Sequence, residues 1–234
     1  MSVTQPTAYD SGFFDMHRQG ARRSAEVIVP LLLELMPCTS VADVGCGTGT
    51  WLAVFAEHGV STLLGIDGDH VDRTRLEIRA DEFRALDLEH PFRLERRFDL
   101  AMSLEVAEHL SPSAAADFVG SLTALAPVVL FSAAIPFQSG RHHVNEQWPD
   151  YWASLFDARR FAAIDCLRLK LWADERVEWW YAQNMVVYAD REALPTLPAL
   201  QSQCGIAPSP PLAMVHPRRY LEWVEWWMAK CGTD

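Results

Sequence analysis

Three glycines at alternate positions form the part of the chain best suited to hold a ligand. Gly45, Gly47 and Gly49 follow an apolar run that ends in Asp43, and a helix-like segment begins at Thr50. Glycine has no Cβ, so its backbone reaches positive φ and lets a ligand approach closely. The free N–H groups at a helix start would face that ligand. The pattern predicts a strand, a turn and a helix that together bind a nucleotide-like molecule.

The spacing of these glycines separates two kinds of nucleotide site. A dinucleotide fingerprint reads G-x-G-x-x-G and, counted from Gly45, requires glycine where Thr50 stands. This mismatch argues against a nicotinamide-dependent dehydrogenase. The observed D-x-G-x-G-x-G instead resembles the first motif of class I S-adenosylmethionine (SAM)-dependent methyltransferases. The resemblance implies a Rossmann-like fold and SAM as the cofactor, with cofactor contacts from Asp43, Gly45, Cys46, Gly47 and Gly49.

Acidic residues end the next two predicted strands. Asp67 precedes Gly68, and its carboxylate can accept two hydrogen bonds from a ribose diol. Asp87 precedes Leu88, and the resemblance implies that this pair reads the adenine ring through the carboxylate and the backbone. For each acid, a solvated residue in a turn is the alternative interpretation.

A further motif follows the fourth predicted strand. Ser103, Glu105, Val106, Glu108 and His109 match an S-x-E-V-x-E-H-L pattern that resembles many small-molecule class I methyltransferases. The resemblance implies that the first three residues lie along the methionine part of SAM and that His109 lies near the acceptor. Four motifs in the right order, over roughly residues 41–135, support this family more strongly than any one of them.

The helix predicted before the first strand carries two arginines that could meet the cofactor. In similar proteins such a helix covers SAM, and Arg23 or Arg22 could bind the SAM carboxylate through a planar guanidinium fork. An arginine pair on a solvated helix face is an equally good interpretation.

The segment after the fifth predicted strand, residues 133–152, is rich in side chains that can do chemistry. It resembles a bacterial subgroup with an H-V-N-E-Q-W-P loop. His143 has a suitable pKa to take a proton from a hydroxyl near neutral pH, and Glu146 could orient it or act instead. We expect five residues to contact the acceptor: His109, His142, Asn145, Trp148 and Trp152. Alternatively, His143 and Glu146 only hold the loop together, Asn145 caps the next helix and Trp148 fills the core.

A metal site is a further possibility for this histidine-rich region. His109, His142, His143 and Glu146 are potential ligands. No two of them have the i, i+4 spacing of a zinc-binding pair on a helix, so the spacing predicts no metal.

Strands that alternate with helices predict an α/β fold. We expect a Rossmann-like, mainly parallel seven-stranded sheet with helices on both faces, and ligands beyond the carboxyl ends of the strands. The predicted strands are 41–45, 61–67, 84–87, 98–104, 128–135, 165–172 and 179–189. The predicted helices are 16–36, 50–58, 112–125 with Ser111 as N-cap, 147–156 and 220–229.

The chain divides into three parts along its length. Residues 1–40 form an N-terminal helical cap, residues 41–190 the SAM-binding core with an acceptor-site loop at 136–152, and residues 191–234 a proline-rich linker and helix in the same domain. Four residues share one face of that last helix: Tyr220, Trp223, Val224 and Trp227. This stripe indicates packing against the domain or, alternatively, a homodimer contact.

Composition limits the partners. The formal net charge is −11, which repels phosphate backbones and anionic lipid, so nucleic acid and membrane are both disfavoured. No apolar run reaches the length of a membrane span, and no signal peptide is visible. The five cysteines include no C-x-x-C pair, which suits reduced thiols in a cytoplasmic protein.

These observations predict a SAM-dependent methyltransferase with a small-molecule acceptor. A hydroxyl of a sugar or natural-product intermediate is the expected target. Methylation of a nitrogen stays open, because oxygen and nitrogen acceptors need the same alignment and similar proton removal. A carboxylate acceptor also stays open; it would need no base, and the two histidines, His142 and His143, would then bind substrate. A SAM-binding partner protein without transferase activity is the alternative from another class, suggested by the aromatic C-terminal helix.

Overall fold

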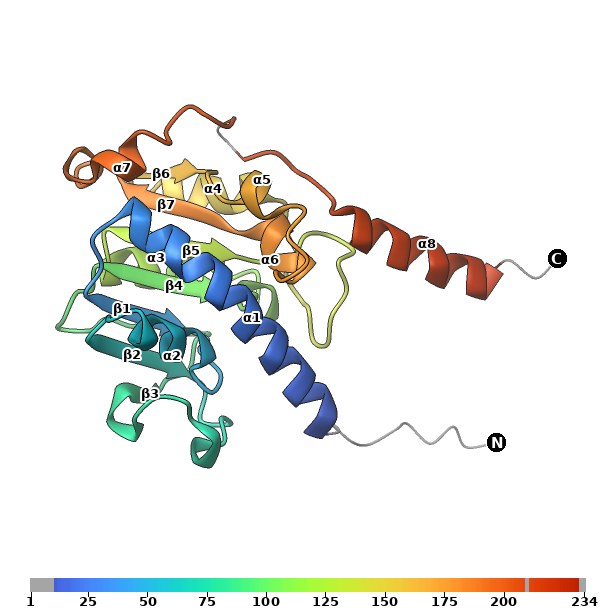
Figure 1. Cartoon of the computed structure of the whole chain (residues 1–234), viewed down its shortest axis with the longest axis horizontal. Helices are drawn as coiled ribbons and strands as arrows, with labels where there is room; N and C mark the ends of the chain where they lie inside the picture. The colour runs from blue at the N-terminus through green and yellow to red at the C-terminus, as the bar shows by residue number, and fades with distance from the viewer. Residues whose placement is uncertain (1–10, 209–210, 232–234) are drawn as a thin grey trace.

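The computed structural model describes residues 11–208 and 211–231 and contains the predicted seven-stranded sheet (Figure 1). The strand order is β3-β2-β1-β4-β5-β7-β6. β7 is antiparallel to both neighbours, and the other pairings are parallel. The strands are β1 (Ser40–Val44), β2 (Thr62–Asp67), β3 (Phe83–Ala85), β4 (Leu100–Leu104), β5 (Val128–Ser132), β6 (Phe161–Ile164) and β7 (Val186–Asp190). The Rossmann-like α/β class is therefore confirmed.

The strand order reverses at the centre of the sheet. β1 pairs with β2 on one side, with Asp43 beside Gly65, and with β4 on the other, with Asp43 beside Met102. The chain first runs outward from β1 to β3 and then returns to β4, so the order reverses between β1 and β4. Ligands of such sheets bind beyond the carboxyl ends of the strands at this reversal.

One face of the sheet is covered mainly by α1 (Ser11–Leu35) and α2 (Thr50–Glu57), and Figure 1 shows α1 running across it. Ile28 of α1, Leu52 of α2 and Met102 of β4 belong to one buried apolar cluster. α1 continues through Pro30 without ending there. The short helices α5 (Arg168–Leu171), α6 (Trp179–Asn184) and α7 (Pro198–Gln201) contribute to the same cluster.

The other face is covered by α3 (Ala115–Leu125) and α4 (Pro149–Asp157). Phe118 of α3 and Phe156 of α4 are buried against it. The Phe156 ring stacks on Tyr188 of β7 with ring centroids 3.8 Å apart. Burial on both faces explains why the central strands are continuous apolar runs rather than alternating ones.

The predicted sixth and seventh strands are wrong in part. Residues 161–164 form β6, whereas the predicted strand 165–172 contains helix α5. Residues 179–184 form helix α6, and only 186–190 continue as β7. In this region the buried Arg168 side chain pairs with Asp165 three residues earlier, and α5 begins at Arg168. A short apolar run such as 179–184 suits a buried helix as well as a strand.

The predicted N-cap at Ser111 is also wrong. α3 begins at Ala115, and Ala114 precedes it. The Ser111 hydroxyl donates to Glu89 Oε2 at 2.8 Å and its N–H donates to Oε1 at 2.9 Å. Ser111 thus ties two loops together instead of capping the helix.

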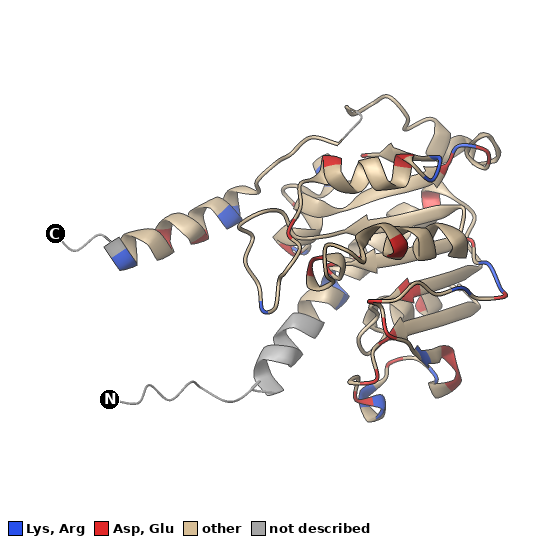
Figure 2. Cartoon of the chain, turned by 180° about the vertical axis from the view of Figure 1, so that it is seen from behind, with Lys and Arg blue, Asp and Glu red and all other residues tan. Residues whose placement is uncertain are grey.

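Short 3₁₀ turns complete the connections at η1 (Arg73–Arg75), η2 (Ala80–Glu82), η3 (Ala107–His109) and η4 (Leu194–Thr196). The first two lie between β2 and β3, where Figure 2 shows basic and acidic residues side by side. Arg73 pairs there with Asp69, and Arg79 with Asp81.

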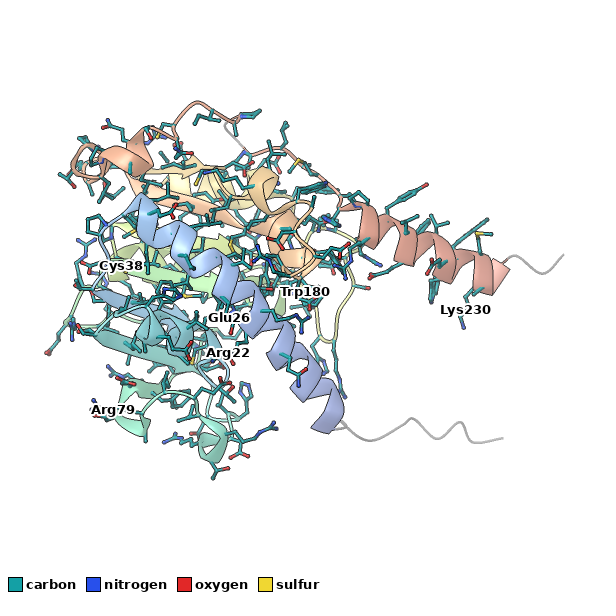
Figure 3. All side chains as sticks on the ribbon, in the orientation of Figure 1. Arg22, Glu26, Cys38, Arg79, Trp180 and Lys230 are labelled. Atoms are coloured by element: carbon teal, nitrogen blue, oxygen red, sulfur yellow. The ribbon has the colours of Figure 1, made fainter. Side chains whose placement is uncertain are left out.

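The C-terminal helix α8 (Pro217–Cys231) extends away from the sheet and its helices (Figures 1 and 3). Six large apolar residues on it are 47–60% exposed: Tyr220, Leu221, Trp223, Trp226, Trp227 and Met228. The prediction that its aromatic stripe packs against the domain is therefore wrong. Within the described residues, no helix has the length and apolar character needed to cross a membrane.

Candidate cofactor and acceptor site

The glycine turn has the conformation that its sequence predicts. Gly45, Gly47 and Gly49 have φ values of 84°, 54° and 86°, which other residues rarely adopt. A methyl group on Gly45 would lie 2.2 Å from Cγ2 of Val106, so this glycine also lets the two motifs pack together. The space beside Gly47 is open, since a methyl group there would meet nothing within 4 Å among the described residues.

Asp67 lies directly beside this turn. Its carboxylate accepts a hydrogen bond from the Gly47 N–H at 2.7 Å and another from the Gly68 N–H at 2.6 Å. The two motifs that the sequence assigned to the cofactor thus meet at the carboxyl ends of β1 and β2.

Asp43 and Cys46 are buried beneath the turn. Burial, and to a smaller extent the nearby Asp67 carboxylate, raises the pKa of Asp43 to about 8. The pKa of the Cys46 thiol is also raised, mainly by burial and then by Asp43. Cys46 is therefore a neutral packing residue whose backbone forms part of the turn.

Asp87 and Leu88 follow β3 at one end of this crevice. The Asp87 carboxylate accepts from the Glu89 N–H at 3.0 Å and contacts His90 Nδ1 at 2.9 Å, and these two interactions lower its pKa. Its side chain is two-thirds exposed, whereas Leu88 is buried. In this structure Asp87 is the solvated turn acid of the alternative interpretation, with a carboxylate still open to a ligand.

The two arginines of α1 are already paired with carboxylates. Arg23 Nη2 donates to Glu178 Oε1 at 2.9 Å. Arg22 donates to Glu57 of α2 and to Glu26, and Figure 3 shows Arg22 and Glu26 together on α1. The structure does not present the expected free guanidinium fork, because protein carboxylates occupy both side chains.

Glu105 lies at the end of β4 in a buried polar network that the sequence did not reveal. Its carboxylate accepts from Gln138 Nε2 at 2.8 Å and from Asn184 Nδ2 at 3.1 Å. Gln138 in turn accepts from Gln183 at 3.0 Å. Burial raises the pKa of Glu105, and its φ of 55° is unusual for a non-glycine residue. The network fixes the motif that follows β4 to the loop after β5 and to α6.

Ser103, in the same motif, is fully buried, and its hydroxyl has no hydrogen-bond partner among the described residues. Val106 packs against the glycine turn as noted above. Ser103 therefore lies behind the surface that a cofactor could touch.

The acceptor-site loop is fastened to the segment after β4 by its backbone. The N–H groups of Val144 and Asn145 donate to the Glu108 carbonyl oxygen at 2.8 and 3.0 Å. Three non-glycine residues of this loop have positive φ: Phe137, Ser139 and His142. Such conformations cost free energy and cluster at functional sites.

His143 and Glu146 form the pair that the sequence predicted. His143 Nδ1 lies 2.8 Å from Glu146 Oε1, and Glu146 Oε2 accepts from the Phe137 N–H at 2.7 Å. The His109 ring packs edge-on against His143 with ring centroids 4.8 Å apart. The pKa of His109 is lowered, first by desolvation and then by His143. Because Nδ1 of His143 is bonded to a carboxylate, its Nε2 is the nitrogen left for chemistry.

The other residues predicted to contact the acceptor differ in how far they are exposed to solvent. His142 is exposed and Trp148 is 38% exposed. Asn145 is buried, accepts from Gln147 Nε2 and does not cap α4, whose N-cap is Trp148. Trp152 is only 2% exposed and packs on Phe131 in the core. The structure brings His109, His143 and Glu146 together, whereas Trp152 is a core residue.

Glu108, in the motif after β4, is a buried carboxylate to which the sequence pattern assigned no role. It is 0% exposed, and neither carboxylate oxygen has a hydrogen-bond partner of good geometry among the described residues. Burial raises its pKa well above the ordinary value, and the Glu105 carboxylate raises it further. The E-H pair in the motif was visible in the sequence, but its burial was not.

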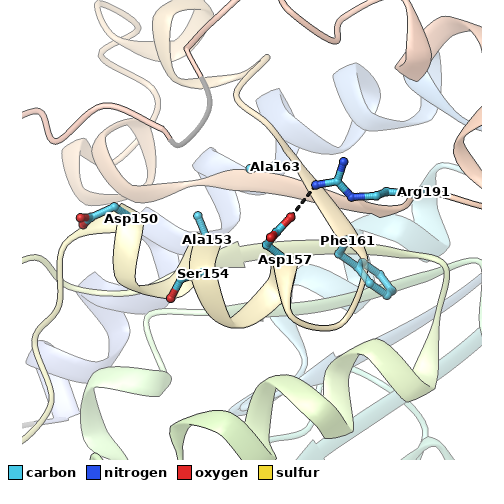
Figure 4. A pocket seen from close by; sticks show the side chains of 7 residues that line it. All are labelled: Asp150, Ala153, Ser154, Asp157, Phe161, Ala163 and Arg191. Atoms are coloured by element: carbon cyan, nitrogen blue, oxygen red, sulfur yellow. Dashed lines mark hydrogen bonds and ion pairs between the residues drawn. The ribbon is translucent and has the colours of Figure 1, made fainter.

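A shallow surface hollow of about 260 Å³ lies elsewhere, between α4 and β6 (Figure 4). The Asp157–Arg191 ion pair crosses it, and Asp150, Ser154 and Phe161 also line it. None of its lining residues is a predicted cofactor or acceptor residue, so it does not serve the crevice at β1 and β4.

Solved structures with a similar fold include three bacterial proteins. Streptomyces venezuelae DesVI is 24% identical over 59% of this chain and 62% of its own, with a TM-score of 0.46. An O-methyltransferase family protein from Burkholderia thailandensis is 15% identical over 78% of this chain and 60% of its own, with a TM-score of 0.54. The third is SAM-bound CalS10 from Micromonospora echinaspora, an amino pentose methyltransferase involved in calicheamicin biosynthesis. It is 15% identical over 80% of this chain and 100% of its own, with a TM-score of 0.55.

The match thus spans less than two thirds of the first two proteins' lengths. No curated protein matches the chain. A family described as a methyltransferase domain matches residues 16–184, which contain every strand of the sheet except β7, together with the acceptor-site loop and α6. With the glycine turn, the strand order and this match in agreement, the chain belongs to the class I SAM-dependent methyltransferases.

Proposed function

We propose that this enzyme methylates a hydroxyl of a small molecule, such as a sugar or a natural-product intermediate. The observation that carries the proposal is the His143–Glu146 pair, held at 2.8 Å beside His109 at the same edge of the sheet as the glycine turn. A hydroxyl needs a proton acceptor as it attacks, and this pair offers one. The amino pentose methyltransferase CalS10 is a case in which this fold accommodates a sugar.

The cofactor would lie along the carboxyl ends of β1, β2 and β4. The ordered motifs suggest contacts with the glycine turn, Asp67, Asp87 and Glu105. The open space beside Gly47 suits a ligand that approaches the backbone. Bound SAM supplies an electrophilic methyl group on a sulfonium and leaves as the neutral thioether S-adenosylhomocysteine.

The protein's part is to align the acceptor and to remove its proton. With the proton on Nδ1 of His143, Glu146 would accept a hydrogen bond from it, and the lone pair on Nε2 would be free. Nε2 would then take the proton of the acceptor hydroxyl as its oxygen receives the methyl group that SAM supplies. The proton passes later to solvent, since His143 is only part-buried.

Methylation of a nitrogen is the second candidate, because the same pair could take a proton from an ammonium group. A carboxylate acceptor would need no proton acceptor, and His142 and His143 would then bind substrate. A partner protein that binds SAM without transferring methyl groups is also consistent with the exposed α8.

The test is a methyl-transfer assay with labelled SAM and a panel of sugars, phenols, amines and acids, read by mass spectrometry. We expect labelled product from a hydroxyl compound. His143→Ala should lower turnover at least about 100-fold, with calorimetric SAM affinity within about twofold of wild type. Absence of SAM and S-adenosylhomocysteine binding would overturn the cofactor assignment, and unchanged turnover would remove His143 from the mechanism.

A further inference from the structure

One carboxylate and two imidazoles converge beneath the acceptor-site loop. Glu108, His109 and His143 each offer a ligand atom, and these three atoms lie within 4.8 Å of one another. Glu108 and His109 belong to η3, and His143 comes from the loop whose backbone is bonded to the Glu108 carbonyl. The spacing along the chain concealed this cluster, because its members do not share a helix face.

Glu108 needs an electrostatic partner that the described residues do not supply. Its side chain is fully buried, and both oxygens lack a hydrogen-bond partner of good geometry among those residues. The backbone N–H groups of Glu108 and Ala134 act to lower its pKa, but burial and the Glu105 carboxylate outweigh them and raise it well above the ordinary value. An unpaired buried carboxylate is costly, whereas a cation between it and the two histidines would satisfy both oxygens.

The orientation of His143 suits metal binding. Its Nδ1 lies 2.8 Å from Glu146 Oε1, so Nε2, which packs beside Gly140, is the nitrogen that would bind an ion. A carboxylate behind the distal nitrogen is the usual outer support of a metal-binding histidine. Glu146 is itself held by the Phe137 N–H at 2.7 Å, so the imidazole is oriented before any ion arrives.

We propose that Glu108, His109 and His143 bind a divalent transition-metal ion of the Zn²⁺, Co²⁺ or Mn²⁺ type. Imidazole nitrogens favour these ions over Mg²⁺ and Ca²⁺, which prefer oxygen ligands. Inward shifts of about 1 Å would bring the three atoms to the separations found around one ion. Three protein ligands leave coordination positions open for water or an oxygen of the acceptor.

This site rests on the proposed function for its hydroxyl acceptor, but it replaces the part that His143 plays there. An acceptor hydroxyl bound to the ion would have a lower pKa and could lose its proton near neutral pH. His143 would then be a ligand, and the proton would leave to solvent rather than to Nε2. The ion would also place the acceptor oxygen at a fixed point beside the methionine end of the cofactor site.

The test uses the full chain without an affinity tag, treated with a chelator and then titrated with Co²⁺. We expect binding of about one ion per chain, with visible absorption bands of a nitrogen- and oxygen-ligated site, and displacement of Co²⁺ by Zn²⁺. His109→Ala and His143→Ala should each weaken Co²⁺ binding more than about tenfold. Glu146→Gln should weaken it about tenfold or more through the orientation of His143.

His58→Ala serves as the matched control, because this exposed histidine ends α2 and is not one of the three ligands. Glu108→Gln tests the buried carboxylate, and circular dichroism establishes that it folds. His109→Ala keeps the test valid if Glu108→Gln does not fold, since His109 is exposed.

Unaltered Co²⁺ binding in the His109→Ala/His143→Ala double variant would overturn the site, as would absent binding up to about 1 mM Co²⁺ in wild type. Calorimetry with SAM on the same samples separates the two proposals. Intact SAM binding and methyl transfer without any metal requirement would leave the proposed function standing with His143 as proton acceptor.

Discussion

Two buried carboxylates, Asp43 and Asp67, lie close to each other beneath the glycine turn. Asp67 accepts two backbone hydrogen bonds, from Gly47 and Gly68. Asp43 is buried, and its pKa is raised to about 8. A proton that the folded chain holds and the unfolded chain releases makes stability depend on pH.

Asp43→Asn should therefore remove part of that dependence. An unfolded aspartate has a pKa of about 3.9, so below pH ~4 both states of wild type are protonated. Between pH ~4 and ~8 the unfolded state releases the proton and wild-type stability falls; above ~8 this contribution levels off. Asn cannot ionise, so we expect the variant to gain about 1–3 kcal/mol over wild type by pH 8.

Urea unfolding from pH 5 to 8.5 measures this difference. Asp69→Asn controls for net charge, since Asp69 is exposed and paired with Arg73. Parallel pH profiles for Asp43→Asn and wild type would show that Asp43 is ionised throughout.

The substitution Gly47→Ala, which adds one methyl group to the glycine turn, tests whether SAM binds beside this backbone. Gly47→Ala meets no neighbouring atom within 4 Å among the described residues, so only its φ of 54° opposes the change, at about 1 kcal/mol. If SAM passes this backbone, the methyl group should lower SAM affinity more than tenfold in calorimetry.

Gly59→Ala is the matched control for Gly47→Ala. Gly59 has a φ of 89°, equally open space and a position after α2, away from the carboxyl ends of the strands. We expect similar destabilisation and unchanged SAM affinity. Equal affinities for both variants would place the cofactor elsewhere.

At the scale of elements, Arg168 connects the second half of the fold. Its guanidinium is fully buried and donates to Asp165 and to the carbonyl oxygens of Gln183 and Leu212. The segment before α8 is held in the same place, because the His216 N–H donates to Gln183 Oε1 at 2.8 Å. One side chain thus joins α5, α6 and the C-terminal segment.

Arg168→Met should destabilise the protein by about 3–5 kcal/mol, since it leaves Asp165 buried without its partner. Urea unfolding gives the magnitude. Arg176→Met removes an exposed arginine from its pair with Asp174 and should cost less than about 1 kcal/mol. A similar small loss for both variants would contradict the anchoring role of Arg168.

The elements most predictable from sequence were those with one dominant local signal. The first five strands follow apolar runs that end in acids or turns, and all five form close to their predicted bounds. The region after residue 160 was harder, because the apolar run at 179–189 is divided between α6 and β7. The division depends on long-range contacts of Arg168 and Gln183, which no local pattern encodes.

As with the secondary structure, the sequence predicted the local motifs of the candidate site but not the contacts between distant segments. Spacing, residue type and the family resemblance together predicted the glycine turn with Asp67 and the His143–Glu146 pair. Spacing could not show that Asn184 reaches Glu105 from α6, or that Glu108 is buried beside two histidines. These contacts arise when the loop after β5 folds back onto the segment after β4.

At the scale of the whole molecule, α8 is the feature without a packing partner in the described chain. Its aromatic residues are about half exposed, and its start is tied to the acceptor-site loop, since Arg219 donates to the Phe137 carbonyl at 2.7 Å. A contiguous exposed apolar surface of this kind marks an interaction site. We propose that a second copy of the chain covers it.

Light scattering after size exclusion should show a dimer that dissociates on dilution. The double variant Trp223→Ser/Trp227→Ser should be monomeric and keep its sheet by circular dichroism. Leu169→Ser is the control, because Leu169 is 72% exposed but lies on α5. A monomeric wild type, or a dimer that survives the double substitution, would rule out this contact.

The two outer strands of the sheet limit how such copies can associate. β3 has three residues and β6 has four, so each edge offers few unpaired backbone groups to another chain. Growth of the sheet across a subunit boundary is therefore disfavoured, and a stable assembly would keep two separate seven-stranded sheets. Self-association would then leave the crevice between β1 and β4 unshared, so each subunit would bind its cofactor independently.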